Sequence, residues 1–340
     1  MRLPLFIIKY TKFEYWPCWL FYFPILPYWL YLSIKNKSLA YFTTANPGIE
    51  LGGFFGESKS DILNLIDKKY LPKSIEVNKI DFETLLKRLS SEEITYPLIA
   101  KPDVGERGTD VQKIENEIEL RDYHNRTTIK YIIQEFITYD IELGVLYSRI
   151  PGIERGKVSS ITLKEFLSVT GDGVSTIKQL MEQSTRARFQ IKRMSEELGT
   201  EMEIILQKNE NRLLEPIGNH CRGTRFIDNN YLINEKLNQV FDRISFSING
   251  FYYGRFDLKV KSIEDLYEGK NIKIMELNGA SSEPGHIYDS SNTIFNAYKD
   301  LLSHWKRLAE VSATNIEKGL KPVAFSIIAK SYLKFVILKK

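Results

Sequence analysis

Two short strands with acidic and amide side chains on one face constrain this chain more than any other feature. In residues 254–260 apolar side chains alternate with charged ones such as Asp257, and in residues 273–278 the side chains of Glu276 and Asn278 share a face. Neighbouring strands would aim these three side chains at one point. Oxygen donors without histidine or cysteine suit a hard cation such as Mg²⁺, which also takes phosphate oxygens. The alternative is a pair of ordinary strands with polar outer faces.

Composition limits the classes of protein to which the chain can belong. Its 340 residues are 43% hydrophobic, enough for a large core divided into two or more subdomains. The net charge is +4 with acids and bases well mixed, so the sequence does not indicate nucleic acid as a partner. Cys18 and Cys221 lie far apart, which indicates neither a disulfide framework nor a cysteine-rich metal site and favours a cytoplasmic setting.

The N-terminal region, residues 1–56, contains an uncharged aromatic run at residues 15–34. The run is long enough to span a membrane, but its three prolines interrupt a regular helix, and Trp and Tyr concentrate at membrane interfaces. We predict that it lies in or dips into one leaflet, with the protein peripheral on the inner face of the membrane. The alternatives are an aromatic core or a dimer face. Residues 311–340 form a basic amphipathic tail that either supports the membrane contact or packs on the body.

The next segment leads into the predicted nucleotide site. Residues 39–42 predict a strand, and the glycines at positions 52, 53 and 56 predict a flexible loop suited to a substrate lid. Ser58 or Ser60 then caps a short helix predicted over residues 61–66, with Lys59 at its start. A cation there would meet a nucleotide, although a solvated surface lysine is the alternative.

A hairpin with two glycines in its loop follows at residues 97–111. The first strand ends in Lys101, and Gly105 and Gly108 let backbone N–H groups approach a phosphate closely. Lys101 adds a point charge for the same phosphate. The loop is not a Walker motif, because no Gly-Lys-Ser/Thr opens a helix, and an ordinary hairpin is the alternative.

Two further apolar strands, residues 131–137 and 141–147, are each interrupted by a carboxylate. Glu135 and Glu142 are therefore candidates for contacts with an adenine or a ribose, or else they mark solvent-exposed strand ends. Two polar segments supply candidate contacts to a carboxylate or phosphate of the substrate, with His220 also a candidate base for an incoming amine. These candidates are His220, Arg222, Arg225, Ser282 and His286.

In this order, residues 97–111, 134–144, 255–258 and 275–278 resemble the motifs of ATP-grasp enzymes. Among the carboxylate–amine ligases of that group, the chain is most similar to the D-alanine–D-alanine ligase branch, over roughly residues 56–308. Residues 169–177 also resemble a loop and helix start of cyanophycin-synthetase-like members.

The resemblance implies a fold and a set of roles. The fold would be α+β: an ATP-grasp domain at residues 57–310, with two α+β subdomains clasping ATP, between the aromatic N-terminal region and the basic tail. Lys101 and, with less support, Lys59 would bind the nucleotide phosphates, and the loop from Gly105 to Thr109, with Gly105 and Gly108, would close over the triphosphate. Glu135, Phe136 and Ile137 would contact the adenine, and Glu142 would bind the ribose. Two Mg²⁺ ions, replaceable by Mn²⁺, would be bound by Asp257, Glu276 and Asn278. Arg255 would stabilise the acyl phosphate.

The implied activity is ATP-dependent joining of a small-molecule carboxylate to an amine through an acyl phosphate, with release of ADP. The inventory of Lys, Arg, Asp, Glu and Asn without a serine or cysteine nucleophile suits phosphoryl transfer. The alternatives are an ATP-grasp phosphotransferase and a catalytically silent, membrane-associated nucleotide-binding protein. Pro284 follows Asn278 at six positions where the ligase pattern has three, which puts D-alanine as the substrate in doubt.

Overall fold

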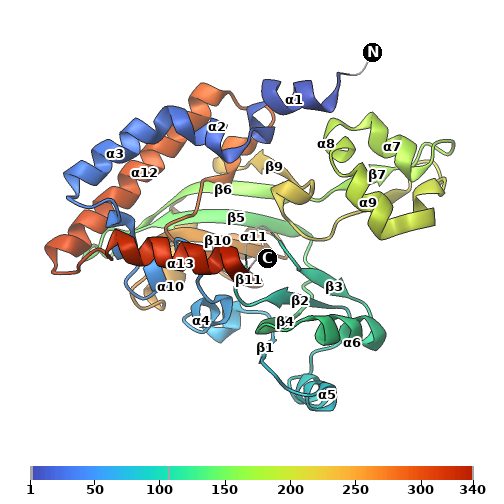
Figure 1. The fold of residues 1–340 in the computed structure, drawn as a ribbon, viewed down its shortest axis with the longest axis horizontal. Coiled ribbons are helices and arrows are strands. Elements are labelled where there is room, and N and C mark those ends of the chain that lie inside the picture. The colour runs from blue at the N-terminus through green and yellow to red at the C-terminus, as the bar shows by residue number, and fades with distance from the viewer. Residues whose placement is uncertain (1–2, 106–107, 339–340) are drawn as a thin grey trace.

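A five-stranded antiparallel sheet forms the centre of the molecule (Figure 1). The computed structural model describes residues 3–105 and 108–338. The strand order is β11-β10-β5-β6-β9, so the two strands that carry the acidic side chains are direct neighbours at one edge. The strands are β5 (Ile141–Ser148), β6 (Lys157–Glu165), β9 (Arg225–Asp228), β10 (Tyr253–Val260) and β11 (Ile272–Asn278).

The alternating pattern of β10 assigns its two faces. Phe256, Leu258 and Val260 point into an apolar core beneath α10 (Glu235–Phe246) and α11 (Ile263–Glu268). Arg255, Asp257 and Lys259 point to the opposite face. At one end that face is covered by α3 (Leu26–Lys35), α12 (Ile294–Glu317) and α13 (Phe325–Leu338), which share a core built around Leu32, Leu308 and Ile328.

A smaller four-stranded sheet in the order β1-β4-β2-β3 lies beside the uncovered end of the large sheet. Its strands are β1 (Ser74–Val77), β2 (Leu98–Pro102), β3 (Gln112–Ile114) and β4 (Tyr131–Glu135). Helices α5 (Phe82–Ser91) and α6 (Glu117–Arg126) cover its outer face, each started by a side-chain cap, Asp81 and Asn116 respectively. The predicted α+β class, with two subdomains around a cavity, is confirmed.

A small helical insertion interrupts the large sheet between β6 and β9. It comprises β7 (Ser168–Thr170), α7 (Ile177–Gln183), α8 (Thr185–Arg188), α9 (Ile191–Leu198) and β8 (Asn211–Leu213), and it has its own apolar core. A capping box between Thr176 and Gln179 begins α7. In Figure 1 the insertion lies beside the N-terminal segment, to which an ion pair between Arg186 and Glu14 attaches it.

The N-terminal region begins with α1 (Leu5–Thr11), and the aromatic run folds into α2 (Cys18–Tyr22) and α3, with one face packed on α12. Phe21 and Ile25 are buried there, and the ring of Tyr22 stacks on Trp305. The predicted interior packing therefore accounts for one face only, because Trp19, Phe23 and other apolar side chains remain exposed. In the part of the chain that the structure describes, no helix combines the length and apolarity needed to cross a membrane.

Two expectations for residues 39–56 were wrong. The predicted strand at 39–42 is instead the start of a 3-10 helix, Tyr41–Thr44, because this segment packs against α12 rather than along a strand edge. The glycine loop is not a free lid. The carbonyls of Gly52 and Gly53 accept hydrogen bonds from the backbone N–H groups of residues 280 and 281, at 2.9 and 3.1 Å.

The two backbones touch at this point. A Cβ atom on Gly53 would lie 2.7 Å from the Cα of Gly279, and Gly53 has φ +76°, so glycine is required on both counts. The contact fixes the loop that follows Asn278.

Of the predicted C-terminal tail, residues 311–317 continue α12, and residues 339–340 lie outside the described residues.

Candidate active site

The uncovered end of the large sheet and the small sheet enclose a cavity of about 940 Å³. This volume lies at the upper end of the range for ligand sites, about 300–1,000 Å³. The cavity is lined by most of the predicted residues: Lys59, Lys101, Gly105, Gly108, Glu135, Phe136, Ile137, Glu142, His220, Arg255, Asp257, Glu276 and Asn278.

The predicted metal-binding trio is brought together by strand register. Asp257 lies directly opposite Glu276, and Arg255 lies opposite Asn278, with all four side chains on the cavity face. The Nδ2 of Asn278 donates to Asp257 Oδ2 at 3.1 Å. Within the described residues, no group of three or more His, Cys, Asp and Glu side chains surrounds one point, so a metal site here needs Asn278 and phosphate oxygens as further ligands.

Asp257 is buried among cations. Arg255 donates to both of its oxygens, Nε to Oδ1 and Nη2 to Oδ2 at 3.0 Å each, and Lys164 Nζ lies 3.4 Å from Oδ1. Burial by itself would raise the pKa of Asp257, but Arg255 and Lys164 hold it below the ordinary value. Gly144 on β5 makes room for this cluster, since a Cβ there would lie 3.2 Å from Asp257 Oδ1.

Lys101 reaches across the cavity from β2 to the large sheet. Its Nζ donates to the carbonyl of Met275 at 3.0 Å and to Gln134 Oε1 at 3.1 Å. Met275 directly precedes Glu276, so the predicted phosphate-binding lysine and the predicted metal-binding acids lie on facing walls of one cavity. Burial lowers the pKa of Lys101 to about 8, although the nearby Glu276 acts in the opposite direction.

This lowered pKa predicts how nucleotide binding depends on pH. Above pH 8 the free protein loses the charge on Lys101, so binding of ADP must restore the proton. We expect the Kd for ADP, measured by titration calorimetry, to rise about tenfold per pH unit above pH 8 and to level off below it. The Lys101→Arg variant keeps its charge and should lack this rise. A wild-type Kd that is constant between pH 7 and 9.5 would contradict the assignment.

The predicted adenine and ribose residues line the same cavity with different contacts. The carboxylate of Glu135 accepts from the backbone N–H of Lys73 at 3.2 Å, and Ile137 offers its carbonyl to Lys259 at 3.0 Å. Lys259 also lies 5.3 Å from the ring centre of Phe136. Residues 135–137 therefore form a fixed connection between the two sheets, as expected of a hinge that carries backbone groups to a base.

Glu142 is buried and paired with Lys164 at 3.1 Å. Lys164 was not among the residues predicted from the sequence, because it lies in a strand that also carries serine, threonine, lysine and glutamate, and no local pattern sets it apart. Because Lys164 also faces Asp257, it connects the predicted ribose contact with the predicted metal site. The lining as a whole is balanced in charge, with seven cationic and seven acidic side chains. Within it, Lys101, Lys164 and Arg255 are the cations that face Glu142, Asp257 and Glu276.

The glycine loop of the predicted hairpin is partly described. Lys59 Nζ donates to the carbonyl of Gly105, which places this lysine at the cavity mouth beside the loop. Of the two serines predicted as caps, Ser58 caps the helix, which spans α4 (Lys59–Leu63) and so begins and ends earlier than the predicted residues 61–66. Residues 106–107 of the loop lie outside the described residues.

His220 lines the cavity but is a weak base. Among the residues that the structure describes, its Nε2 has no hydrogen-bond partner, and it lies 3.9 Å from Glu14 Oε2. Burial, with a smaller contribution from Arg186, lowers the pKa of His220 to about 3. The imidazole therefore stays neutral near pH 7 and has little affinity for a proton from an ammonium group.

The four other predicted substrate contacts do not line the cavity. Arg222 donates to the carbonyls of Gly108 and Val111 and pairs with Glu215, and Arg225 pairs with Glu165 at the surface. The hydroxyl of Ser282 donates to the backbone carbonyl of Asn278 at 2.6 Å, and buried His286 bonds Ser160 and Asp300. The polar groups of these four side chains hold loops in place. The sequence shows only that polar residues lie near a motif, and it does not show whether they bind a ligand or the protein itself.

Comparison with known proteins returns structural similarity only. No family model matches the sequence, and no curated protein matches it. Among solved structures, a bifunctional glutathione synthetase from Pasteurella multocida is 16% identical, with a TM-score of 0.37 over 72% of this chain and 36% of its own. VanG D-Ala:D-Ser ligase from Enterococcus faecalis is 14% identical, with a TM-score of 0.42 over 76% of this chain and 60% of its own.

D-alanine–D-alanine ligase from Bacillus anthracis is 15% identical, with a TM-score of 0.42 over 76% of this chain and 67% of its own. This chain thus matches between about a third and two thirds of the length of these proteins. In overall arrangement, the chain is similar to ATP-grasp ligases, with D-alanine–D-alanine ligases among them.

Proposed function

We propose that this protein is an ATP- and Mg²⁺-dependent ligase that joins a carboxylate to an amine through an acyl phosphate. One observation carries the proposal: Lys101 from the small sheet bonds the backbone beside Glu276, so a triphosphate in the cavity would meet cations on one wall and acids on the other. Phosphoryl transfer requires positioning and charge stabilisation more than covalent participation by the protein.

Different residues of the cavity would bind the phosphates, the base and the reacting group. Lys101 and Lys59 hold the phosphates, the connection at residues 135–137 holds the base, and Arg255 faces the charge that develops on the acyl phosphate. The donor set of Asp257, Glu276 and Asn278 fits Mg²⁺, which would neutralise charge on the transferred phosphoryl group. The acyl carbon then accepts the amine, and phosphate leaves.

The test is a mass-spectrometric search for a new amide after incubation with ATP, Mg²⁺ and a cell extract. We expect an amide and ADP in equal amounts, and neither product with Glu276→Gln. A phosphorylated acceptor without an amide would instead indicate a phosphotransferase. ATP binding without ADP release under a broad substrate screen would indicate a silent nucleotide-binding protein.

We further propose that the protein binds peripherally to anionic membranes through its N-terminal helices. Trp19, Phe23 and Ile34 are 68%, 72% and 78% exposed, in a segment that lies along the edge of the molecule in Figure 1. The described residues 3–37 contain four lysines and a single acid, Glu14, which is buried against Arg186. Exposed aromatic residues beside lysines are typical of interfacial helices.

Replacing Trp19 and Phe23 together with glutamate is expected to reduce binding to phosphatidylserine vesicles at least about tenfold in a flotation assay, because apolar contact is lost and charge repulsion is added. Ile118→Glu on α6 is the matched control, since Ile118 is 75% exposed in the small subdomain, and it should float like the wild type. Equal flotation of the double variant and the wild type would contradict membrane docking by this surface.

A further inference from the structure

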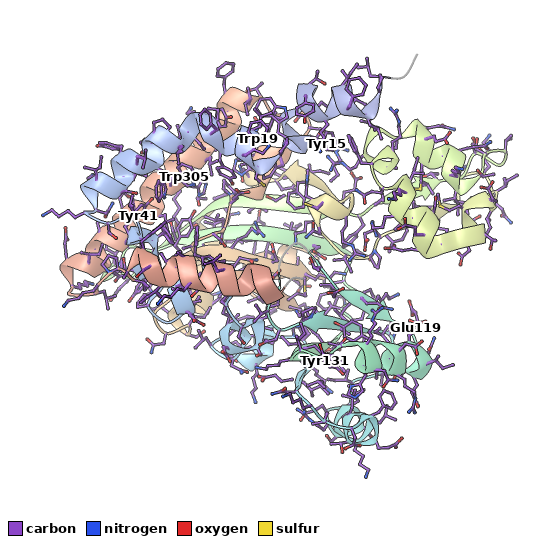
Figure 2. The ribbon with its side chains drawn as sticks, in the orientation of Figure 1. Tyr15, Trp19, Tyr41, Glu119, Tyr131 and Trp305 are labelled. Atoms are coloured by element: carbon purple, nitrogen blue, oxygen red, sulfur yellow. The ribbon has the colours of Figure 1, made fainter. Side chains whose placement is uncertain are left out.

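Part of the cavity lining is a cluster of aromatic side chains, several of them around His220, which we call the aromatic chamber. The chamber is lined by Tyr15, Trp16, Tyr22, Phe189, Phe226 and Tyr288. The first three belong to the N-terminal segment, which covers the chamber; the ring of Tyr15, labelled in Figure 2, lies 4.7 Å from that of Phe189 in the helical insertion. The buried ion pair of Glu14 with Arg186 attaches this cover to the insertion.

Glu283 lies beside these rings, since its side chain is bonded to Tyr288. Glu283 Oε2 accepts a hydrogen bond from the hydroxyl of Tyr288 at 2.8 Å, and the Glu283 backbone carbonyl accepts one from Arg255 Nη1 at 3.3 Å. Asp257, Glu142 and Glu14 each pair with a lysine or arginine, whereas within the described part of the chain no basic side chain forms an ion pair with Glu283. Burial raises the pKa of Glu283 to about 7.

The surroundings of Glu283 supply little competing charge. The titratable and charged groups that face the Glu283–Tyr288 pair are Arg255 from β10, Cys18 from the N-terminal segment and His220, whose ring lies 5.5 Å from that of Tyr288. Arg255 is engaged by Asp257, and His220 is neutral. An unpaired carboxylate in an aromatic chamber is a complement for an organic ammonium ion, which is attracted both to the carboxylate and to ring faces.

We infer that Glu283, oriented by Tyr288, binds the ammonium group of the second substrate and accepts its proton, and that this substrate is a primary amine on an apolar or aromatic body. The inference rests on the proposed ligase function and names its amine substrate class. Glu283 lies in the stretch that lengthens the loop after Asn278. The guanidinium groups in this part of the lining belong to Arg186 and Arg255, and both form ion pairs with protein carboxylates, which disfavours binding of the carboxylate of a free amino acid.

The step balances as follows. The ammonium group gives one proton to Glu283, and the freed nitrogen lone pair forms the C–N bond to the acyl carbon. The bond from that carbon to the phosphate oxygen breaks, and the phosphate leaves with the electron pair and the second N–H proton. Arg255, next to Glu283 along this wall, faces the departing negative charge.

The test is binding of phenethylamine, measured by titration calorimetry on the full chain, with 2-phenylethanol as its uncharged counterpart. We expect phenethylamine to bind the wild type at least about tenfold more tightly than 2-phenylethanol or D-alanine. Glu283→Gln, which keeps the shape and can still accept the Tyr288 hydroxyl, should remove this preference, and Tyr288→Phe should reduce it.

A pH profile separates this role from a structural one. Below pH 7 the Glu283 carboxyl takes up a proton, so phenethylamine affinity should fall about tenfold per pH unit in the wild type and remain level in Glu283→Gln. The inference is overturned if the wild type does not prefer phenethylamine, or if Glu283→Gln keeps both the preference and the pH profile. Glu276→Gln separates the two proposals, since it should abolish ligase activity while phenethylamine still binds.

Discussion

Replacing Lys101 with alanine is expected to weaken ADP and ATP binding by roughly 10- to 150-fold. A charge-assisted contact of this kind contributes about 1.5–3 kcal/mol, and each 1.4 kcal/mol is a tenfold change in Kd. Lys101 is buried with its Nζ held between Met275 and Gln134, so its charge is fixed in position on this wall of the cavity. Titration calorimetry with ADP and Mg²⁺ measures the effect.

Lys87→Ala provides the control for that loss. Lys87 lies on α5 in the same subdomain, is exposed and is remote from the cavity lining. Its removal should leave the affinity for ADP within about twofold of the wild type. If the Lys101 and Lys87 variants bind ADP equally well, the nucleotide does not lie against β2.

The second large effect is a loss of stability in Asp257→Asn, which should lower the free energy of unfolding by about 3 kcal/mol or more. The substitution leaves two buried cations, Arg255 and Lys164, without their shared carboxylate, and breaking a buried pair on one side costs about 3–5 kcal/mol. The pKa of Asp257 is lowered in the folded protein, so its stabilising contribution is present above the ordinary pKa of an aspartate and is lost as the pH falls. Urea unfolding monitored by circular dichroism measures this difference.

Glu276→Gln is the matched comparison on the neighbouring strand. In the described residues Glu276 forms no ion pair within 4.0 Å, so its substitution should leave stability in the metal-free protein nearly unchanged. Both variants should lose Mg²⁺-dependent nucleotide binding. Equal stability of Asp257→Asn and the wild type would show that the buried cation cluster does not hold Asp257 as described.

Local sequence patterns were sufficient to predict that the side chains on one face of β10 and β11 lie together. Alternation in β10 and β11 predicted that Asp257, Glu276 and Asn278 share a face, and their strand register shows the same. Lys101 at the end of an apolar strand was also recognisable. These features depend on a few adjacent residues and on the two-residue period of a strand, both of which can be read directly from the chain.

Contacts between distant segments could not be predicted in this way. The pairing of Glu14 with Arg186 and of Glu142 with Lys164 depends on which segments the fold places side by side. The position of residues 14–22 beside the chamber could not be predicted for the same reason. The structural roles of Arg222 and His286 were also not predictable, because the sequence near a motif does not show whether a polar side chain binds a ligand or another part of the protein. Glu283 was overlooked because its isolation from cations is visible only in three dimensions.

The most direct test of the central claim, a triphosphate held between Lys101 and the acids of β10 and β11, is a crystal structure with ADP and Mn²⁺ located by anomalous scattering. We predict the Mn²⁺ signal beside Asp257 and Glu276, and a phosphate oxygen of ADP within hydrogen-bonding distance of Lys101 Nζ. A nucleotide bound elsewhere, or Mn²⁺ remote from both carboxylates with ADP present, would contradict it.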